Sequence, residues 1–208
     1  FKHLSNEFRG APFWAWNTKL DREELLRQID CFHEMGFGGF FMHSRAGMAT
    51  KYLGEEFMAS VRACVVRAKE YGMQACLYDE DRWPSGFAGG YVTKEKELRQ
   101  KQVCLSLKSP EEFFTFYKEF ERDPKMVCVF DIVFDDYDRM ADYRVISVDE
   151  KAQGEKWYAY QIYKPCCGYH NGLTYSDTLN PKAVDKFIET THEKYKRELG
   201  DDFGNAVP

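Results

Sequence analysis

The stretch Met-Gln-Ala-Cys-Leu-Tyr-Asp-Glu-Asp-Arg-Trp-Pro-Ser-Gly-Phe-Ala-Gly-Gly, residues 73–90, changes character halfway along its length. It begins as an uncharged apolar run and continues into three successive carboxylates, an arginine, a tryptophan and a Pro-Ser-Gly turn. A buried parallel strand that ends abruptly in charge delivers those side chains to the sheet edge where ligands bind. Adjacent carboxylates repel one another, so we expect a cation, a metal or a polar ligand beside them. The alternative is a solvated loop whose acids face water.

The same organisation occurs earlier in the chain. Ala11 to Asn17 reads as a short aromatic strand, and Asp21 caps the helix that follows it, with Glu24 placed to complete a capping box. Residues 38–42 form the next expected strand, which ends in His-Ser-Arg, and a second amphipathic helix covers about 54–71. Strands that alternate with helices in this way build a parallel sheet with right-handed crossovers. The polar strand ends are therefore expected to gather on one rim.

The pattern changes near Thr93, where strand-like alternation replaces the strand–helix repeat. We expect a small antiparallel α+β insertion over 94–167, with the first domain comprising 1–93 and 168–208. Asn180-Pro181 is a strong helix start in that returning part. The expected insertion elements are strands at 102–108, 126–135, 143–148 and 156–164, and one helix at 110–121.

Composition limits the function classes. The formal net charge of the 208 residues is −5 and no basic stripe stands out, so no nucleic-acid partner is expected. Aromatic residues make up 16% of the chain, and several stand beside polar residues, which suits a carbohydrate or another flat polar ligand, though a large core would use them too. No signal peptide or apolar span of membrane length is seen, so no membrane partner is expected. The chain does not begin with Met, which leaves room for a removed upstream segment.

The seven cysteines are an odd number and several lie in apolar runs. This usage predicts a reducing, cytoplasmic compartment without a disulfide framework. Cys166 and Cys167 with His170 form the stub of a metal site at most, because structural zinc ligands come as spaced pairs. We expect no metal or other cofactor, although calcium would suit a run of carboxylate oxygens.

Three strands and three helices remain outside the insertion, whereas an eight-unit barrel takes about 250 residues. The first domain is therefore either a small three-stranded α/β domain or the front end of a longer enzyme. An incomplete barrel leaves two sheet edges uncovered, so self-association into a homo-oligomer is one expectation. Coverage of the edges by helices or by the insertion is the other.

Several strings carry a more specific resemblance. Residues 9–17 (Arg-Gly-Ala-Pro-Phe-Trp-Ala-Trp-Asn), 36–45 (Gly-Phe-Gly-Gly-Phe-Phe-Met-His-Ser-Arg), 52–57 and 77–86 (Leu-Tyr-Asp-Glu-Asp-Arg-Trp-Pro-Ser-Gly) resemble the N-terminal half of the catalytic barrel in α-L-rhamnosidase-like glycoside hydrolases. Residues 175–195 resemble the helix before that family's fourth strand. The similarity is greatest to bacterial members of the group, and it does not indicate which sugar is the substrate.

The resemblance implies a partial (β/α)8 (TIM) barrel of the first three to four βα units, and hydrolysis of O-glycosidic bonds. Such enzymes need two carboxyl groups, one of which protonates the leaving oxygen. In the family, the next strand ends in Asp-Glu-Pro, and its glutamate is a natural candidate for that acid. The resemblance implies that this strand would lie beyond Pro208. We therefore expect this chain to be inactive alone. The alternative function is a non-catalytic carbohydrate-binding or interaction domain, which would use the same rim.

Four candidate residues end the first two strands. Trp16 would floor a sugar subsite and Asn17 would bond hydroxyls, unless Trp14 and Trp16 fill the core and Asn17 is a turn residue. His43 and Arg45 point the same way if their strand continues. Arg45 would then neutralise a carboxylate on the third strand, either at a binding site or as a structural ion pair.

The strongest candidates are Asp79, Glu80, Asp81 and Arg82, with Trp83 shaping the rim. Alternation places the two aspartates on one face, with Glu80 and Arg82 on the other. One face is expected to reach the pocket while the other braces the loop. A purely structural role would instead leave the acids scattered in space.

Tyr175 and Asp177 are the last candidates, expected to approach the same rim, with a role in helix entry as the alternative. Together these residues predict a carbohydrate-binding rim, and the catalytic carboxylates are left unassigned.

Overall fold

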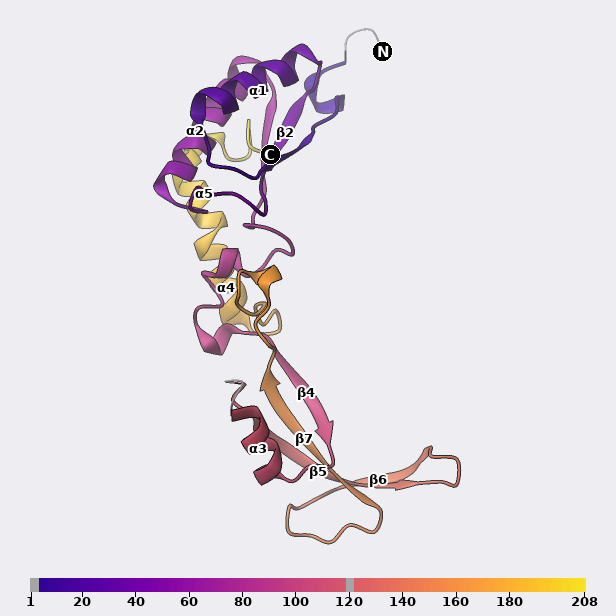
Figure 1. Cartoon of the computed structure of the whole chain (residues 1–208). Helices are drawn as coiled ribbons and strands as arrows, with labels where there is room; N and C mark the ends of the chain where they lie inside the picture. Colours follow the sequence, from indigo (N-terminus) through magenta and orange to yellow (C-terminus); the bar gives the residue numbers. More distant parts are fainter. Residues whose placement is uncertain (1–3, 119–121) are drawn as a thin grey trace. The chain divides into compact units, whose positions relative to one another are not determined.

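The computed structural model describes residues 4–118 and 122–208, and its chain forms two compact units (Figure 1). The first unit comprises the residues up to Lys94 together with Asn180–Pro208, and the second is Glu95–Leu179. Residues 168–179, expected in the first domain, belong to the second unit. There the amide of Gln100 donates to the carbonyl of Tyr175, and the amide of Asp177 donates to the carbonyl of Leu98, both at 2.8 Å.

The first unit is built on a three-stranded parallel sheet with the strand order β1-β2-β3. Trp14 of β1 pairs with Met42 of β2, and Met42 pairs with Leu77 of β3, which places the three strands in register. Its strands and helices are β1 (Phe13–Trp16), α1 (Arg22–Glu34), β2 (Gly39–Ser44), α2 (Glu55–Glu70), β3 (Gln74–Leu77), α4 (Pro181–Thr190) and α5 (His192–Leu199), with short 3-10 helices at Asn6–Phe8, Ala88–Gly90 and Gly200–Asp202.

The helix boundaries follow from local chemistry. The Asp21 carboxylate accepts the amide of Glu24 at 2.9 Å, so the predicted cap of α1 is confirmed. The Glu24 side chain does not reach back to complete a capping box and instead binds Arg27 and Gln28. Asn180 caps α4 as predicted, by accepting the amide of Lys182.

The core lies between one face of the sheet and the helices α1 and α2. Trp14 contacts Phe32 of α1 edge-on at 5.4 Å between ring centroids, and Trp16 contacts Phe57 of α2 at 5.6 Å. Each large apolar side chain buried here contributes about 1.5–3 kcal/mol. On the opposite face Phe13 is 56% exposed, so the helices cover only one side of the sheet.

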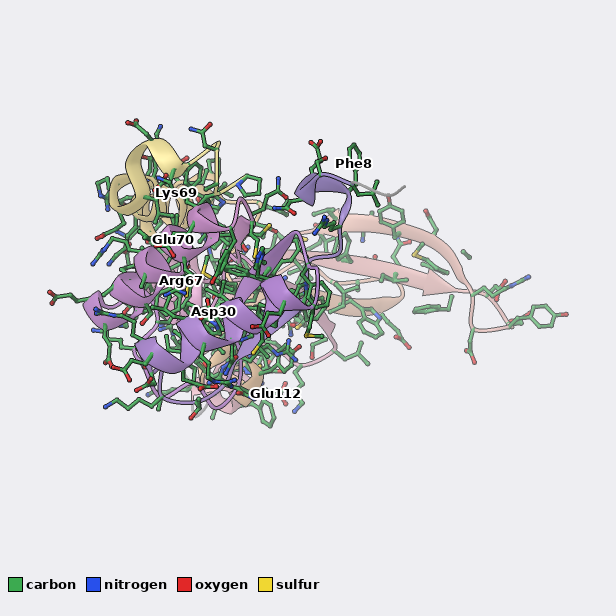
Figure 2. The ribbon with its side chains drawn as sticks, turned by 90° about the horizontal axis from the view of Figure 1, so that it is seen from above. Phe8, Asp30, Arg67, Lys69, Glu70 and Glu112 are labelled. Carbon is green, nitrogen blue, oxygen red and sulfur yellow. The ribbon has the colours of Figure 1, made fainter. Side chains whose placement is uncertain are left out.

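The helices α1 and α2 are also joined at their polar margins. The Arg67 guanidinium of α2 lies 2.7 Å from the Asp30 carboxylate of α1 and 3.1 Å from Glu70 of its own helix (Figure 2). Such half-exposed pairs contribute up to about 1 kcal/mol each, so they set the register of the two helices more than the stability of the unit.

The predicted partial TIM barrel is wrong. The structure has an open three-stranded parallel sheet and a separate four-stranded antiparallel sheet. After α5 the described chain adds no further strand to the parallel sheet; the carbonyl of Ala206 accepts the amide of Ala75 on the outer side of β3, at 2.8 Å. The strand–helix repeat predicts parallel pairing between neighbours, but it does not distinguish an open sheet from one that curves towards closure.

The second unit is an antiparallel sheet with the order β4-β7-β5-β6 and one helix. Phe113 of that helix stacks on Tyr160 of β7, with ring centroids 3.7 Å apart. Residues 119–121 of the predicted helix lie outside the described residues. The elements are β4 (Lys101–Ser106), α3 (Pro110–Lys118), β5 (Lys125–Phe134), β6 (Met140–Ile146) and β7 (Glu155–Tyr163), with 3-10 helices at Lys96–Leu98 and Gly168–His170.

Candidate functional site

The loop after β3 is organised around the buried side chain of Glu80, which has no solvent exposure. One carboxylate oxygen accepts the amides of Gly86, Phe87 and Ala88 at 3.1, 3.0 and 2.7 Å. The other oxygen accepts the amide of Asp81 at 2.8 Å and the amide of Gly89. Five backbone donors thus converge on one carboxylate, as in an anion-binding nest. Glu80 therefore holds residues 81–89 in a fixed turn and is closed off from any ligand.

Burial and hydrogen bonding act on the Glu80 carboxyl in opposite directions. Burial raises its pKa to about 7, while the hydrogen bonds from the backbone amides lower the pKa because they favour the charged form. A carboxyl with a pKa near neutrality is a common feature of general acids. Here both oxygens are occupied by the protein backbone, so the shift belongs to a structural anchor.

A substitution at Gly89 would damage this turn. Gly89 has a positive φ of 60°, and a Cβ built on it would lie 3.0 Å from the Cβ of Asp81 and 3.1 Å from the ring of Tyr52. The backbone can therefore approach both side chains only because no side chain is present. The close approach positions Asp81 and Tyr52 in the wall of the pocket described below.

The two aspartates that flank Glu80 are each held by a serine hydroxyl. Ser44, at the end of β2, donates to Oδ1 of Asp81 at 2.7 Å, which ties the ends of β2 and β3 together. Ser85 donates to Oδ1 of Asp79 at 2.5 Å. The side chain of Asp81 is 13% exposed and that of Asp79 is 36% exposed, so both keep some access to solvent.

An arginine and a histidine stand near these aspartates at longer range. Nε of Arg82 lies 3.8 Å from Oδ2 of Asp81, and Nε2 of His192 lies 3.8 Å from Oδ2 of Asp79. Within the described residues Arg45 forms no ion pair, so the cation beside Asp81 is its neighbour in sequence rather than the arginine at the end of β2. The expected pairing of Arg45 with a third-strand carboxylate is therefore not seen.

His43 and Trp16 lie inside the protein. The His43 ring is 1% exposed, lies 3.8 Å from the Tyr78 ring and 4.3 Å from the Phe13 ring, and places Nε2 3.4 Å from the carbonyl oxygen of Arg82. Burial lowers the pKa of its imidazole. Trp16 is 2% exposed and presents no ring to a ligand.

The remaining predicted residues are distributed between the units. Asn17 and Arg45 are exposed at the ends of β1 and β2, and Trp83 is exposed after β3. Tyr175 and Asp177 belong to the second unit, where Asp177 accepts the amide of Leu179 at 3.3 Å and Tyr175 lies 5.6 Å from the His170 ring. The structure therefore brings Asp79, Asp81 and Arg82 into one loop of the first unit, whereas Tyr175 and Asp177 belong to the second unit.

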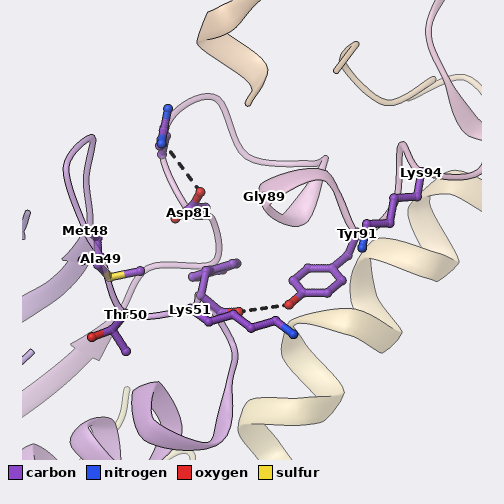
Figure 3. Close-up of a pocket in the computed structure, with 10 residues that line it drawn as sticks. Met48, Ala49, Thr50, Lys51, Asp81, Gly89, Tyr91 and Lys94 are labelled. Atoms are coloured by element: carbon purple, nitrogen blue, oxygen red, sulfur yellow. Dashed lines mark hydrogen bonds and ion pairs between the residues drawn. The ribbon is translucent and has the colours of Figure 1, made fainter. Parts of the chain in front are cut away.

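A pocket of about 290 Å³ opens beside Asp81 (Figure 3). The loop between β2 and α2 forms one wall, through residues 48–52, and Asp81, Arg82 and Gly89 form another. Tyr91 and Lys94 complete the lining, with the Tyr91 hydroxyl donating to the carbonyl of Tyr52 at 3.3 Å and the Lys94 ammonium 5.1 Å from the Tyr91 ring centroid. A carboxylate, an aromatic ring and cationic groups thus share one hollow, a lining that suits a polar ring-shaped ligand.

Most residues that line the pocket were not predicted from the sequence, and the functionally most important of them are Lys51, Tyr91 and Lys94. Lys51 lies in the loop that follows the polar end of β2, and the rule that ligands bind at the carboxyl ends of parallel strands would have directed attention to that loop. No comparable signal marks Tyr91 and Lys94, because they enter the pocket after the turn around Glu80.

The described residues hold no group of three or more His, Cys, Asp or Glu side chains placed to bind a metal ion. Of the expected Cys166, Cys167 and His170 grouping, the structure shows the contact between Cys167 Sγ and His170 Nδ1, at 3.1 Å. Across 4–118 and 122–208 no helix has the length and apolar character needed to cross a membrane. The chain matches no protein-family model, and it matches no curated protein sequence.

Proposed function

We propose that this chain binds the sugar of an O-glycoside in the pocket beside Asp81 and serves as the substrate-binding part of a glycoside hydrolase. The observation that carries the proposal is the grouping of Asp81, the Tyr91 ring and Arg82 at the carboxyl end of the parallel sheet. Carboxylate oxygens accept hydrogen bonds from sugar hydroxyls, and an aromatic wall packs against the apolar face of a sugar ring. The similarity of residues 77–86 to α-L-rhamnosidase-like hydrolases points the same way.

The proposal gives this chain sugar binding and assigns it no catalytic acid. Glu80 is the rim carboxyl whose pKa is raised, and its oxygens are sealed by the backbone. Asp79 and Asp81 are accessible, but each already accepts a serine hydroxyl. This arrangement favours a second candidate, a non-catalytic carbohydrate-binding domain, in which no group has to protonate a leaving oxygen.

Two further expectations stay predictions. We propose a reducing, cytoplasmic location, supported by seven cysteines that are all free thiols. Self-association through the edges of the parallel sheet is supported by the outer edge of β1, which pairs with no strand among the described residues. Analytical ultracentrifugation over a range of concentrations measures it, and a monomer at every concentration would contradict it.

Calorimetric titration of the chain with neutral oligosaccharides, together with an assay on aryl glycosides, tests the main proposal. Asp81→Asn is expected to weaken sugar binding by about tenfold, because a neutral amide accepts a weaker hydrogen bond from a hydroxyl than a carboxylate does. The matched control is Asp142→Asn on β6 of the second unit, which should leave binding unchanged. Binding with hydrolysis supports the hydrolase and binding alone supports the carbohydrate-binding domain, whereas absence of both contradicts the proposal.

A further inference from the structure

A second hollow of about 460 Å³ adjoins the sugar pocket, because Lys51 and Tyr91 line both. It lies between the start of α2, around Gly54, and the helices α4 and α5. Its basic side chains come from parts of the chain distant in sequence, since Lys186 lies on α4 and Arg197 on α5. The two hollows together are large enough for more than one sugar ring, whereas the first hollow alone holds a single ligand ring.

The lining of the joined hollows is strongly basic for a chain with a formal net charge of −5. Three carboxylates line them, those of Glu55, Asp81 and Glu189. The cationic residues that line one hollow or the other are Lys51, Arg82, Lys94, Lys186, Lys194 and Arg197. This local excess of positive charge indicates a ligand with negative charge.

The arrangement within the hollows gives that ligand an orientation. Asp81 is in the first hollow and repels an anion, but it accepts hydrogen bonds from hydroxyls. In the second hollow Lys194 is held in place by donation to the carbonyl of Leu53 at 2.6 Å, and Glu189 is engaged by Lys186 at 3.2 Å. Lys51 and Arg197 form no ion pair in the described part of the chain, so their charges are not already neutralised there.

We propose that the two hollows bind an acidic oligosaccharide, with a neutral sugar beside Asp81 and a sugar carrying a carboxylate or a sulfate ester between Lys51 and Arg197. The inference rests on the proposed function and adds the chemical class of the substrate. Ammonium and guanidinium groups bind carboxylates and sulfate esters alike. The lining therefore indicates a negatively charged sugar, and it does not distinguish which of the two anionic groups the sugar carries.

The test compares three ligands on the full chain by calorimetric titration: an oligogalacturonide, a sulfated galactose oligosaccharide and a neutral galactose oligosaccharide of equal length. At least one acidic ligand is expected to bind about tenfold more tightly than the neutral one, and the tighter of the two identifies the source of the charge. Raising the ionic strength from about 0.05 M to about 0.5 M should remove most of this difference by screening. It should leave binding of the neutral ligand almost unchanged.

The double variant Lys51→Gln/Arg197→Gln is expected to lose the preference for the acidic ligand while keeping the affinity for the neutral one. Lys151→Gln, at an exposed position of the second unit, is the control for removal of a surface lysine outside the hollows and should keep the preference. Equal binding of neutral and acidic ligands overturns the inference and leaves the proposed function standing. Binding of no oligosaccharide overturns both, and equally tight binding of inorganic phosphate or of an oligonucleotide overturns the saccharide assignment.

Discussion

The role of Glu80 as an anchor can be tested by Glu80→Gln, which preserves the shape of the side chain. At about pH 8, above the pKa of about 7, the wild-type carboxylate offers two charged oxygens to five backbone amides. Glutamine offers one oxygen, which can serve either the set of three amides or the set of two. At least two buried amides then lose their acceptor, and each costs about 1–3 kcal/mol.

The expected loss of unfolding free energy in Glu80→Gln is therefore about 2–6 kcal/mol, measured by urea denaturation with an unchanged slope. Asp79→Asn is the matched control, because the neighbouring carboxylate is partly exposed and accepts a single serine hydroxyl. Its loss is expected to stay below about 1 kcal/mol. Amide hydrogen exchange measures the effect at the turn itself. The amides of residues 86–89 should lose protection from exchange in Glu80→Gln and keep it in Asp79→Asn. Equal stability of the two variants, with protected amides in both, would refute the anchor role.

Two further outcomes follow from the same contacts. Gly89→Ala should lower the free energy of unfolding by more than about 1 kcal/mol, because φ is positive and the added Cβ would crowd Asp81 and Tyr52. Gly168→Ala is the control, since an added Cβ there meets no atom within 4 Å, and it should leave the melting temperature unchanged. In the second unit Asp131 accepts the amides of 153 and 154 and pairs with Arg144, which lowers the pKa of Asp131; Asp131→Asn should lower the melting temperature at neutral pH, and the difference from wild type should shrink as acid protonates the carboxylate.

Features that depend on neighbouring residues could be predicted from the sequence. Asp21 and Asn180 cap their helices as expected, because a cap needs only the amides two or three residues ahead. The parallel pairing of β1, β2 and β3 also follows from a local pattern, since each strand is linked to the next by a helix. Closure into a barrel depends on strands that must meet across the whole fold, and no local pattern specifies it.

The site shows the same division. Alternation separated Glu80 from Asp79 and Asp81, and the structure indeed gives them different surroundings, because Glu80 is buried while the aspartates keep solvent access. The sequence could not show that the buried face is closed by the loop's own backbone, since that closure requires the turn through Gly89. Nor could it show that Lys51 joins the pocket, because the folded positions of two loops decide that contact.

An NMR titration of the isotopically labelled chain with neutral and acidic oligosaccharides would show directly whether the rim beside Asp81 binds a saccharide. We expect the backbone amide shifts that change on binding to cluster in two segments, 48–54 and 81–94, which contain the residues lining the hollow beside Asp81 and part of the lining of the second hollow. Asp81→Asn should weaken these changes. An absence of shifts at saturating sugar, or shifts confined to the second unit, would contradict the claim that this rim binds a saccharide.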